Sequence, residues 1–353
     1  MRILVSGCCG FVGSALCRAL CELQPQASLF GLDNLMRPGS EQNRILMRHL
    51  GVRFFHGDQR SAVDVAGLPP VDWVIDAAAI PDVRAGLGDD SVLLLEHNVL
   101  GTLNLLEYCR RHGAGLLLLS SSRVYSIQGL RSLPLKEESR GYRLDGEAPL
   151  PAGVSERGIS PDFSTEAPVS LYGATKLAAE RLAQEYGEAF GLPVWITRCG
   201  ILAGAGQFGT PRQGIIAYWI HAHRQRRPLR YTGFGGKGLQ TRDVLHPRDL
   251  AALLVKQMKA GRPEHPCVWH AGGGTANAIS LRGLTEWCDQ WFGPHPVAAE
   301  PSEPRYDVPW IVMDSTAAEA AFGWRAATPL QEILEEIARH AEAHPDWLEI
   351  SQA

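Results

Sequence analysis

Arg2-Ile-Leu-Val-Ser-Gly7-Cys-Cys-Gly10-Phe-Val-Gly13-Ser joins a strand pattern at residues 2–6 to a helix-like run at residues 15–23. Glycines spaced Gly-x-x-Gly-x-x-Gly between a strand and a helix let the backbone turn tightly. A pyrophosphate can then approach the backbone and be stabilised by the N-terminus of the helix. The triplet alone is weak evidence, so the prediction of a dinucleotide site also depends on residues further along the chain.

A second strand, residues 28–32, ends at Asp33, twenty residues past Gly13. At this place a carboxylate would accept hydrogen bonds from an adenosine ribose. A carboxylate also repels a 2′-phosphate, and no arginine follows immediately. Asp33 therefore favours NAD over NADP.

Further strands alternate with helix-like runs along the chain. They are residues 52–56, ending in Gly57-Asp58; 73–75, ending in Asp76-Ala-Ala-Ala79; 116–119, running into Ser120-Ser-Ser-Arg-Val-Tyr125; and 193–198. This alternation is typical of an α/β fold with a doubly wound parallel sheet, in which ligands bind at the carboxyl ends of the strands. We expect a Rossmann domain at residues 1–200, to which 242–262 return, and a smaller C-terminal substrate-binding lobe at 201–241 and 263–353.

Ser170-Leu-Tyr-Gly-Ala-Thr-Lys176 opens the helix-like run at residues 171–190. Tyr172 and Lys176 are four residues apart and share a helix face, so the ammonium can lie beside the phenol. A free tyrosine has a pKa of about 10, and a nearby cation favours its phenolate. The pair is therefore a candidate general base, although an exposed polar pair explains the same spacing when it is taken alone.

Composition excludes several other classes of protein. The 353 residues are 45% hydrophobic and 20% charged. The net charge of −4 argues against binding to nucleic acid or to an anionic membrane, both of which attract basic proteins. No apolar run approaches the ~20 residues of a membrane span. The chain starts in a strand without a signal sequence, which predicts a cytoplasmic protein. Eight scattered cysteines lack metal-ligand spacing, so we expect reduced thiols and no metal.

Two segments outside the strands are candidates for substrate contacts. Residues 126–170 are polar and punctuated by Pro and Gly, and a long segment of this kind is usually a functional loop, so we expect a lid. Arg242 follows the glycine-rich stretch 233–238. Its guanidinium fork suits a phosphate or diphosphate.

In their order and spacing, these motifs resemble the extended short-chain dehydrogenases/reductases of the nucleotide-sugar epimerase/dehydratase group. The resemblance covers essentially the whole chain. It is carried by Gly7-x-x-Gly10-x-x-Gly13, Asp33, Asp58, Asn98, the serine strand end, Tyr172-x-x-x-Lys176, Arg242-Asp-Val-Leu-His246, the glycines at 272–274 and Gly323-Trp324. It implies a Rossmann fold, NAD as cofactor and a nucleotide-diphosphate sugar as substrate.

The resemblance also implies a role for each matched residue. The glycine turn would hold the pyrophosphate, Asp33 the adenine ribose, Asp58 the adenine and Lys176 the nicotinamide ribose. The positions expected to bind the cofactor are Gly7, Gly10, Phe11, Val12, Gly13, Asp33, Asn34, Asp58, Ala77, Ala78, Asn98 and Lys176. Those expected to bind substrate are Ser121, Ser122, Arg123, Tyr172, Gln213 and Arg242. The catalytic residues implied are Tyr172, Lys176 and Ser121, with Ser122 as the fallback for Ser121.

Three departures from the family pattern bear on the reaction or on the substrate contacts. The 4,6-dehydratases carry Asp-Glu after the catalytic Ser/Thr, whereas this chain has Ser122-Arg123, so dehydration is disfavoured. Ser126 replaces a family glycine, and Ile201-Leu-Ala-Gly204 replaces Asn-x-Tyr-Gly. Arg123, which is among the expected substrate-binding residues, could reach the substrate or point away from it, and we slightly favour the second.

The closest subfamily resemblance is to the CDP-paratose 2-epimerases. It rests on Leu32-Asp-Asn-Leu-Met-Arg-Pro-Gly-Ser40, Asn98 to Glu107, Gly206-Gln-Phe-Gly209, Gln213-Gly214 and, above all, Gly233 to His246. The main hypothesis is therefore NAD-dependent epimerisation of a nucleotide-diphosphate sugar, with the hydride removed from a ring carbon and returned. We favour C2 by resemblance, with C4 second.

Two other hypotheses stay open. A net nucleotide-sugar dehydrogenase or reductase would use the same residues but release NADH. A catalytically silent NAD-sensing or scaffold protein would bind NAD without turnover.

The last expectation concerns assembly. The helix-like runs 92–111 and 171–190 carry apolar residues on more than one face, for example Leu94, Leu95, Leu105 and Leu106. The family resemblance implies that such helices pair in a homodimer. Burial within one chain explains the same leucines nearly as well.

Overall fold

Seven parallel strands form the central sheet of the computed structural model, which describes residues 1–88, 91–265, 267–302 and 304–352. Their order is β14-β10-β5-β4-β1-β2-β3. The strands are β1 (Arg2–Ser6), β2 (Ser28–Asp33), β3 (Arg53–His56), β4 (Trp73–Asp76), β5 (Gly115–Ser121), β10 (Val194–Cys199) and β14 (Cys267–Ala271). The order reverses between β1 and β4, so the doubly wound sheet predicted from the sequence is confirmed.

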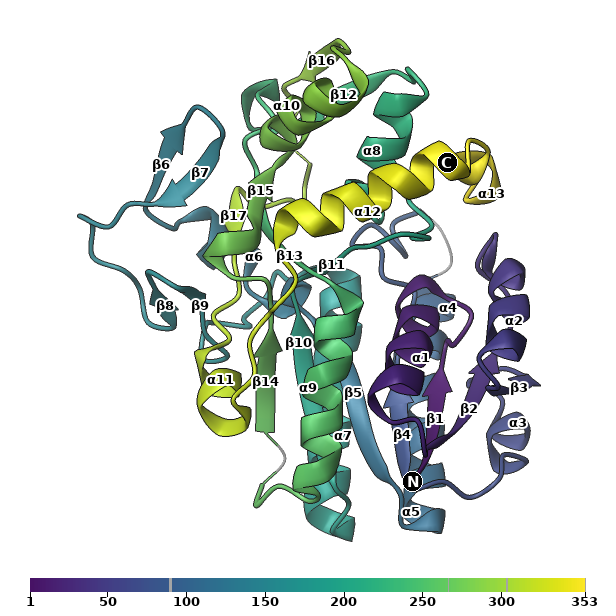
Figure 1. Cartoon of the computed structure of the whole chain (residues 1–353). Helices are drawn as coiled ribbons and strands as arrows, with labels where there is room; N and C mark the ends of the chain where they lie inside the picture. The colour runs from purple at the N-terminus through teal and green to yellow at the C-terminus, as the bar shows by residue number, and fades with distance from the viewer. Residues whose placement is uncertain (89–90, 266, 303, 353) are drawn as a thin grey trace.

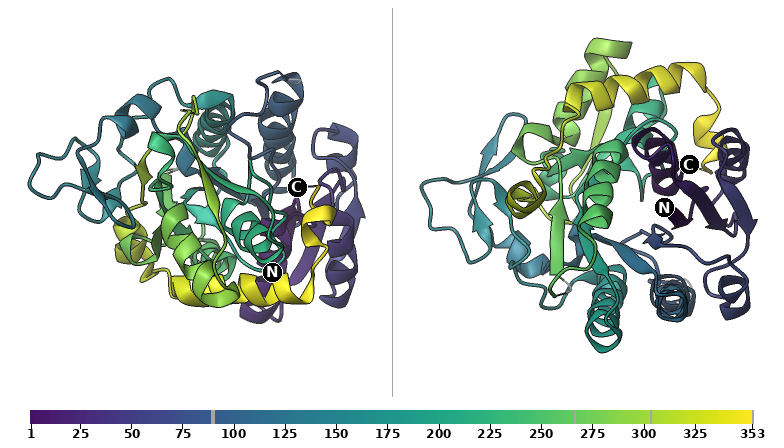
Figure 2. Two further views of the ribbon diagram at one scale, coloured as in Figure 1. Left: turned by 90° about the horizontal axis from the view of Figure 1, so that it is seen from above. Right: turned by 60° about the horizontal axis from the view of Figure 1, so that its bottom comes forward.

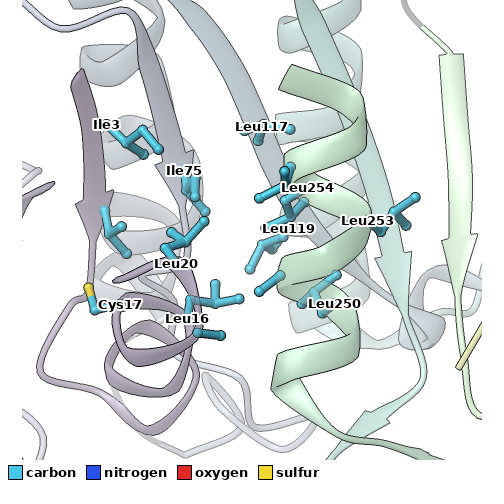
Figure 3. Packing of buried hydrophobic residues seen from close by; sticks show 14 of the residues in the cluster. Ile3, Leu16, Cys17, Leu20, Ile75, Leu117, Leu119, Leu250, Leu253 and Leu254 are labelled. Atoms are coloured by element: carbon cyan, nitrogen blue, oxygen red, sulfur yellow. The ribbon is translucent and has the colours of Figure 1, made fainter. Parts of the chain in front are cut away.

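Helices cover both faces of this sheet because alternate side chains of each strand point to opposite sides. Ile3 and Val5 pack in one cluster, whereas Leu4 packs in the other. The first face is covered by α1 (Phe11–Leu23), α2 (Ser40–His49) and α9 (Pro247–Ala260). The second is covered by α3 (Ala62–Ala66), α5 (Gly101–His112) and α7 (Ser170–Phe190). The right view of Figure 2 shows the two layers, and Figure 3 shows leucines of α1 and α9 meeting over β1, β4 and β5.

A smaller lobe lies above the carboxyl ends of the strands (Figure 1). Its main sheet has the order β11-β13-β15, with β17 also paired to β13, and β12 pairs separately with β16. Its elements are β11 (Ile201–Leu202), α8 (Ile215–Arg224), β12 (Leu229–Thr232), β13 (Thr241–Leu245), β15 (Ala278–Ser280), α10 (Leu281–Phe292), β16 (Val297–Glu300), β17 (Trp310–Ile311), α12 (Leu330–Ala343) and α13 (Trp347–Ile350). A separate apolar cluster fills the space between α8, α10 and α12.

The chain passes between the large sheet and the smaller lobe at several places. The boundaries between these two parts differ from the predicted ones. After β10, Gly200 leads into β11, and after β13 the chain returns to the large sheet as α9. It then forms β14, against which α11 (Thr316–Phe322) packs. Thus β14 and α11 belong with the large sheet rather than the lobe, whereas β13 belongs to the lobe.

Residues 126–170, predicted to be a loop, contain regular structure. They form α6 (Ile127–Arg131) and two hairpins, β6 (Leu135–Glu138) with β7 (Gly141–Leu144) and β8 (Val154–Ser155) with β9 (Gly158–Ile159). Backbone bonds from Tyr142 to Leu239 and from Ile159 to Val312 attach the hairpins to the lobe. The β6–β7 hairpin projects from the side of the molecule (Figures 1 and 2).

The helical run predicted at residues 92–111 is interrupted. It consists of α4 (Ser91–Leu95), a π-helical turn η1 (Glu96–Leu100) and α5. Leu94, Leu105 and Leu106 are buried within the chain, and only Leu95 of the four leucines singled out in the sequence is exposed. None of the described helices is long and apolar enough to cross a membrane.

Candidate active site

A cavity of about 1230 Å³ lies between the carboxyl ends of the central strands and the smaller lobe. Its wall includes the β1–α1 turn, the ends of β2, β4 and β5, the start of α7, and residues of the lobe around Arg242 and Asp307. Every site residue predicted from the sequence lines it except Asp58 and Asn98. The sequence-distant motifs therefore meet in one place.

The three glycines of the β1–α1 turn are required by close backbone packing. Gly7 has a φ of +65°, and a Cβ at Gly13 would lie 2.1 Å from the carbonyl oxygen of Gly7. A Cβ on Gly7 would itself lie 2.8 Å from Cα of Ala78. Gly10 directly precedes α1, whose first N–H groups have no partner within the helix. This turn can hold the pyrophosphate of a dinucleotide against the helix N-terminus.

Asp33 is held in place at the end of β2 by two backbone groups. Its carboxylate accepts bonds from Cys9 N and Leu35 N, both at 2.8 Å. A carboxylate has about four acceptor positions, so it can still accept the hydroxyls of a ribose. Burial raises the pKa of Asp33, although these N–H donors oppose the shift.

Asp58 and Asn98 do not line the cavity, and both support residues that do. Burial disfavours the Asp58 carboxylate, but bonds from Arg60 and Asn34 outweigh it and hold the pKa below its usual range. Asn98 accepts from Ile80 N at 2.9 Å and donates to Thr175 Oγ1 at 3.0 Å, which ties the segment after β4 to α7. Their predicted contacts with the cofactor stay predictions.

Tyr172 and Ser121 both line the cavity. Tyr172 is in the first turn of α7 and is buried, and Ser121 is the last residue of β5. Burial raises the pKa of the phenol, whereas the hydrogen bond with Ser121 and the positive charge of Arg123 lower it. The neighbouring Cys199 also raises the pKa of Tyr172.

Lys176 is buried one turn further along α7. Burial lowers the pKa of its ammonium, and the carboxylates of Asp76 and Glu180 act against that change. Asp76 is fixed at the end of β4 by Ser6 at 2.9 Å and Thr102 at 2.7 Å. That Lys176 lowers the pKa of Tyr172 stays a prediction.

Glu180 is a residue that the sequence analysis did not select. It forms a buried ion pair with Arg198 on β10, at 2.7 Å, and accepts a bond from Ser120 at 2.5 Å. Tyr172, Lys176 and Glu180 follow one another at intervals of four, so they occupy one face of α7. The sequence could have indicated Glu180, because it is a charged residue on the same helix face as Tyr172 and Lys176.

Asp307, Arg123 and Arg242 form a group on the lobe side of the cavity. Arg242 Nη2 lies 2.7 Å from Asp307 Oδ1, and Arg123 Nη2 lies 3.8 Å from the same oxygen. Arg123 lines the cavity, so whether its side chain reaches the substrate or points away from it stays a prediction. Asp307 was missed because it lies on an irregular segment without a motif.

Gln213 and Arg37 connect the two parts of the cavity wall. Gln213 Oε1 accepts a bond from Arg37 Nη1 at 3.0 Å, and Arg37 Nη2 also donates to Phe208 O at 2.6 Å. No residue between 126 and 170, all of which the structure describes, lines the cavity, and a lid role for this segment stays a prediction.

Cys8, Cys9 and Asp33 are close enough together to be considered as metal ligands. However, the hydrogen bond with Cys9 and burial raise the pKa of the Cys8 thiol well above its ordinary value. Thiolate is the form that binds metals, and Asp33 is already engaged by two N–H groups. This group is better explained as packing beneath the glycine turn.

A doubly wound sheet with a glycine turn beside a buried tyrosine, serine and lysine defines a dinucleotide-dependent enzyme that acts on hydroxyl or carbonyl groups. Residues 3–272 match the NAD dependent epimerase/dehydratase family, so the chain belongs to that family and its cofactor is NAD.

Known relatives include both kinds of activity named in the family description. The chain is 29% identical over 295 residues to CDP-paratose 2-epimerase of Salmonella typhi, with 80% of this chain and 82% of that protein covered. It is also 29% identical over 360 residues to dTDP-glucose 4,6-dehydratase of Streptomyces antibioticus, covering 98% and 93%. The structure of MoeE5 in complex with UDP-glucose and NAD is similar with a TM-score of 0.76 and 26% identity, covering 97% and 99%.

The glycine turn gives a direct test of the cofactor site. Gly13→Ala places a methyl group where Gly7 O lies at 2.1 Å, so the turn must open. We expect NAD affinity to fall at least tenfold and the melting temperature to fall, measured by calorimetry and thermal unfolding. Gly146→Ala is the matched control, because no atom lies within 4 Å of its added Cβ. Unchanged NAD affinity in Gly13→Ala would contradict this role for the turn.

Proposed function

We propose that this enzyme epimerises a nucleotide-diphosphate sugar by oxidising a ring hydroxyl transiently and reducing the ketone from its other face. The observation that carries the proposal is that Tyr172, Ser121 and Lys176 line one cavity together with the glycine turn. In this proposal the large sheet binds NAD and the smaller lobe binds the nucleotide-diphosphate sugar.

Tyr172, Ser121 and Lys176 have distinct tasks. NAD, held by the glycine turn and Asp33, would supply the hydride acceptor for the oxidation and the hydride donor for the reduction. Ser121 accepts or donates a hydrogen bond at the reacting oxygen, while Tyr172 as phenolate removes the proton of the hydroxyl. Tyr172 then gives this proton back when the ketone is reduced. Lys176, held by the charges of Asp76 and Glu180, is placed to bind the nicotinamide ribose.

The site offers little support for dehydration. Removal of water needs an acid and a base near the reacting carbons, and the 4,6-dehydratase pattern supplies both directly after the catalytic serine or threonine. Here those positions are Ser122 and Arg123. Among the described residues that line the cavity, the carboxylates are Asp33 at the cofactor end and Glu300 and Asp307 in the lobe.

For the substrate we favour a CDP-linked sugar inverted at C2. This choice is supported by the similarity to the Salmonella enzyme and by the matching stretch at residues 233–246. A 4-epimerase is the alternative, and so is a net nucleotide-sugar dehydrogenase or reductase, because each could use the same tyrosine, serine and lysine. The fate of the hydride separates the epimerases from the dehydrogenase.

We expect the enzyme to convert one member of a panel of CDP-, UDP-, dTDP- and GDP-sugars into its epimer in deuterated water, followed by proton NMR. The inverted carbon should carry no deuterium and absorbance at 340 nm should not grow, because the same hydride returns. Tyr172→Phe should lower the rate about 10²- to 10⁴-fold. Tyr142→Phe is the matched control, since Tyr142 lies on the β6–β7 hairpin outside the cavity.

Two results would contradict this mechanism. Deuterium at the inverted carbon would indicate enolisation, and steady accumulation of NADH would indicate a dehydrogenase. NAD binding without turnover of any sugar in the panel, in wild type as in Tyr172→Phe, would favour a sensing or scaffold protein.

The pH dependence of the reaction is set by the pKa of Tyr172. Burial raises this pKa, so the phenol is protonated at low pH and the base form grows as pH rises. We expect kcat/KM to increase with pH up to a plateau. Ser121→Ala removes a bond that lowers the pKa of Tyr172, so its rising limb should move to higher pH. A limb that stays in place or moves to lower pH would contradict the assignment.

We also propose that the enzyme is a homodimer. Leu95 on α4, Leu100 on η1 and Leu171 on α7 are 50%, 40% and 42% exposed, and contacts between α4 and α7 bring these elements together. An apolar group at one place suits a two-fold interface. Light scattering at micromolar concentration should give twice the monomer mass of 38.5 kDa, and a monomer mass would contradict the proposal.

A further inference from the structure

Two loops from different parts of the molecule meet at the cavity. The β2–α2 loop (residues 34–39) directly follows Asp33 and belongs to the large sheet, whereas the β11–α8 segment (residues 203–214) joins two elements of the lobe. Both line the cavity, the first with Arg37 and the second with Gln213 among their residues. A contact between them therefore connects the cofactor side of the cavity to the lobe side.

Arg37 makes this contact through two hydrogen bonds. Its Nη1 donates to Gln213 Oε1 at 3.0 Å, and its Nη2 donates to Phe208 O at 2.6 Å. A guanidinium is charged at neutral pH, and hydrogen bonds from a charged donor are stronger than those from a neutral one. One side chain of the β2–α2 loop thus holds the β11–α8 segment at two points that are five residues apart.

Apolar packing brings the same two loops together. A Cβ on Gly39, which has a φ of +87°, would lie 2.8 Å from Phe208 Cε1 and 2.8 Å from Ile350 Cγ2. Phe208 is buried and stacks on Trp347, with the ring centroids 5.2 Å apart. Trp347 and Ile350 both belong to α13. The β2–α2 loop, the β11–α8 segment and α13 are therefore in direct contact.

The β11–α8 segment is also held together internally. Thr210 N donates to Gln213 O at 2.7 Å, and Gln213 N donates to Thr210 O at 3.2 Å. Gln207 O accepts a bond from Trp347 Nε1 at 2.9 Å. Because its backbone is fixed at both places, the segment responds as a unit to the bonds from Arg37.

We propose that Arg37 is a positioning residue that couples the two ligand sites: it holds the β11–α8 segment against the β2–α2 loop, which slows the release of NAD and strengthens the binding of a nucleotide in the lobe. Slow release suits a cycle in which the same hydride returns, because the cofactor must stay bound until the ketone is reduced. The inference rests on the proposed function only in placing the nucleotide in the lobe.

Exchange of bound NAD tests the proposal. The purified holoenzyme is mixed with an excess of isotopically labelled NAD, and the labelled fraction on the protein is followed by mass spectrometry after rapid desalting. Arg37→Met keeps an unbranched side chain but removes both donors. We expect exchange to be about 10- to 100-fold faster, as for the loss of hydrogen bonds from a charged group. An exchange rate equal to that of wild type would overturn the proposal.

Two further variants control this measurement. Arg48→Met is the matched control and should exchange NAD at the wild-type rate, because Arg48 is exposed on α2 and does not line the cavity. Arg37→Lys keeps the charge and a donor but not the fork of the guanidinium, so its rate should lie between those of wild type and Arg37→Met. An Arg37→Lys rate outside this interval would contradict the role of the two bonds.

Gln213→Leu changes the same contact from the lobe side. It removes the acceptor of the Arg37 Nη1 bond, so NAD exchange should accelerate even when no nucleotide is present. In the double variant with Arg37→Met, the acceleration should be smaller than the product of the two single effects, as for residues in contact. Single effects that multiply would show that the two residues act independently, which would overturn the coupling.

Nucleotides added to the exchange reaction test the link between the two sites. The probes are CDP, UDP, dTDP and GDP, of which at least one should slow NAD exchange in wild type, and Arg37→Met should lose this slowing because coupling is reciprocal. If no probe slows exchange in wild type, or if the slowing persists in Arg37→Met, the coupling is overturned while epimerisation of a sugar still supports the proposed function. Exchange that behaves as expected, without epimerisation of any sugar, would count against the proposed function alone.

Discussion

The close approach of three backbone segments at the β1–α1 turn constrains the rest of the structure. Gly13 on α1 lies against Gly7 O, and Gly7 lies against Ala78 after β4. Helix α1, β1 and β4 therefore approach one another so closely that a side chain at Gly7 or Gly13 would not fit between them. The same constraint fixes the start of α1 at the edge where Asp33 and Ser121 end their strands, so the cofactor site and the catalytic residues share one framework.

Buried charges form the second layer of this framework. Lys176, Glu180 and Arg198 are removed from water, and an unpaired charge in such a place would cost several kcal/mol. Glu180 pairs with Arg198, and the carboxylates of Asp76 and Glu180 favour the charged form of Lys176. The face of α7 that presents Tyr172 is thus anchored electrostatically to β4 and β10.

Much of the fold could be predicted from sequence because it depends on local pattern. The geometry of a turn or a helix face is set within a few residues. Local patterns therefore predict it, such as the glycine spacing, the strand end at Asp33 and the Tyr172–Lys176 interval. The return of β14 to the sheet and the approach of Asp307 to Arg242 depend on how distant segments pack, which no local pattern records. Arg123 shows the same limit, because its ion pair with Asp307 joins two segments that are far apart in sequence.

The crossings between the large sheet and the lobe pack closely against one buried residue of β13. Gly200, between β10 and β11, would place a Cβ 2.9 Å from Asp243 Oδ2, and Gly272, after β14, would place one 2.3 Å from the same oxygen. Neither crossing leaves room for a side chain beside Asp243. These two glycines therefore determine how closely β13 of the lobe can lie to the strand ends of the large sheet.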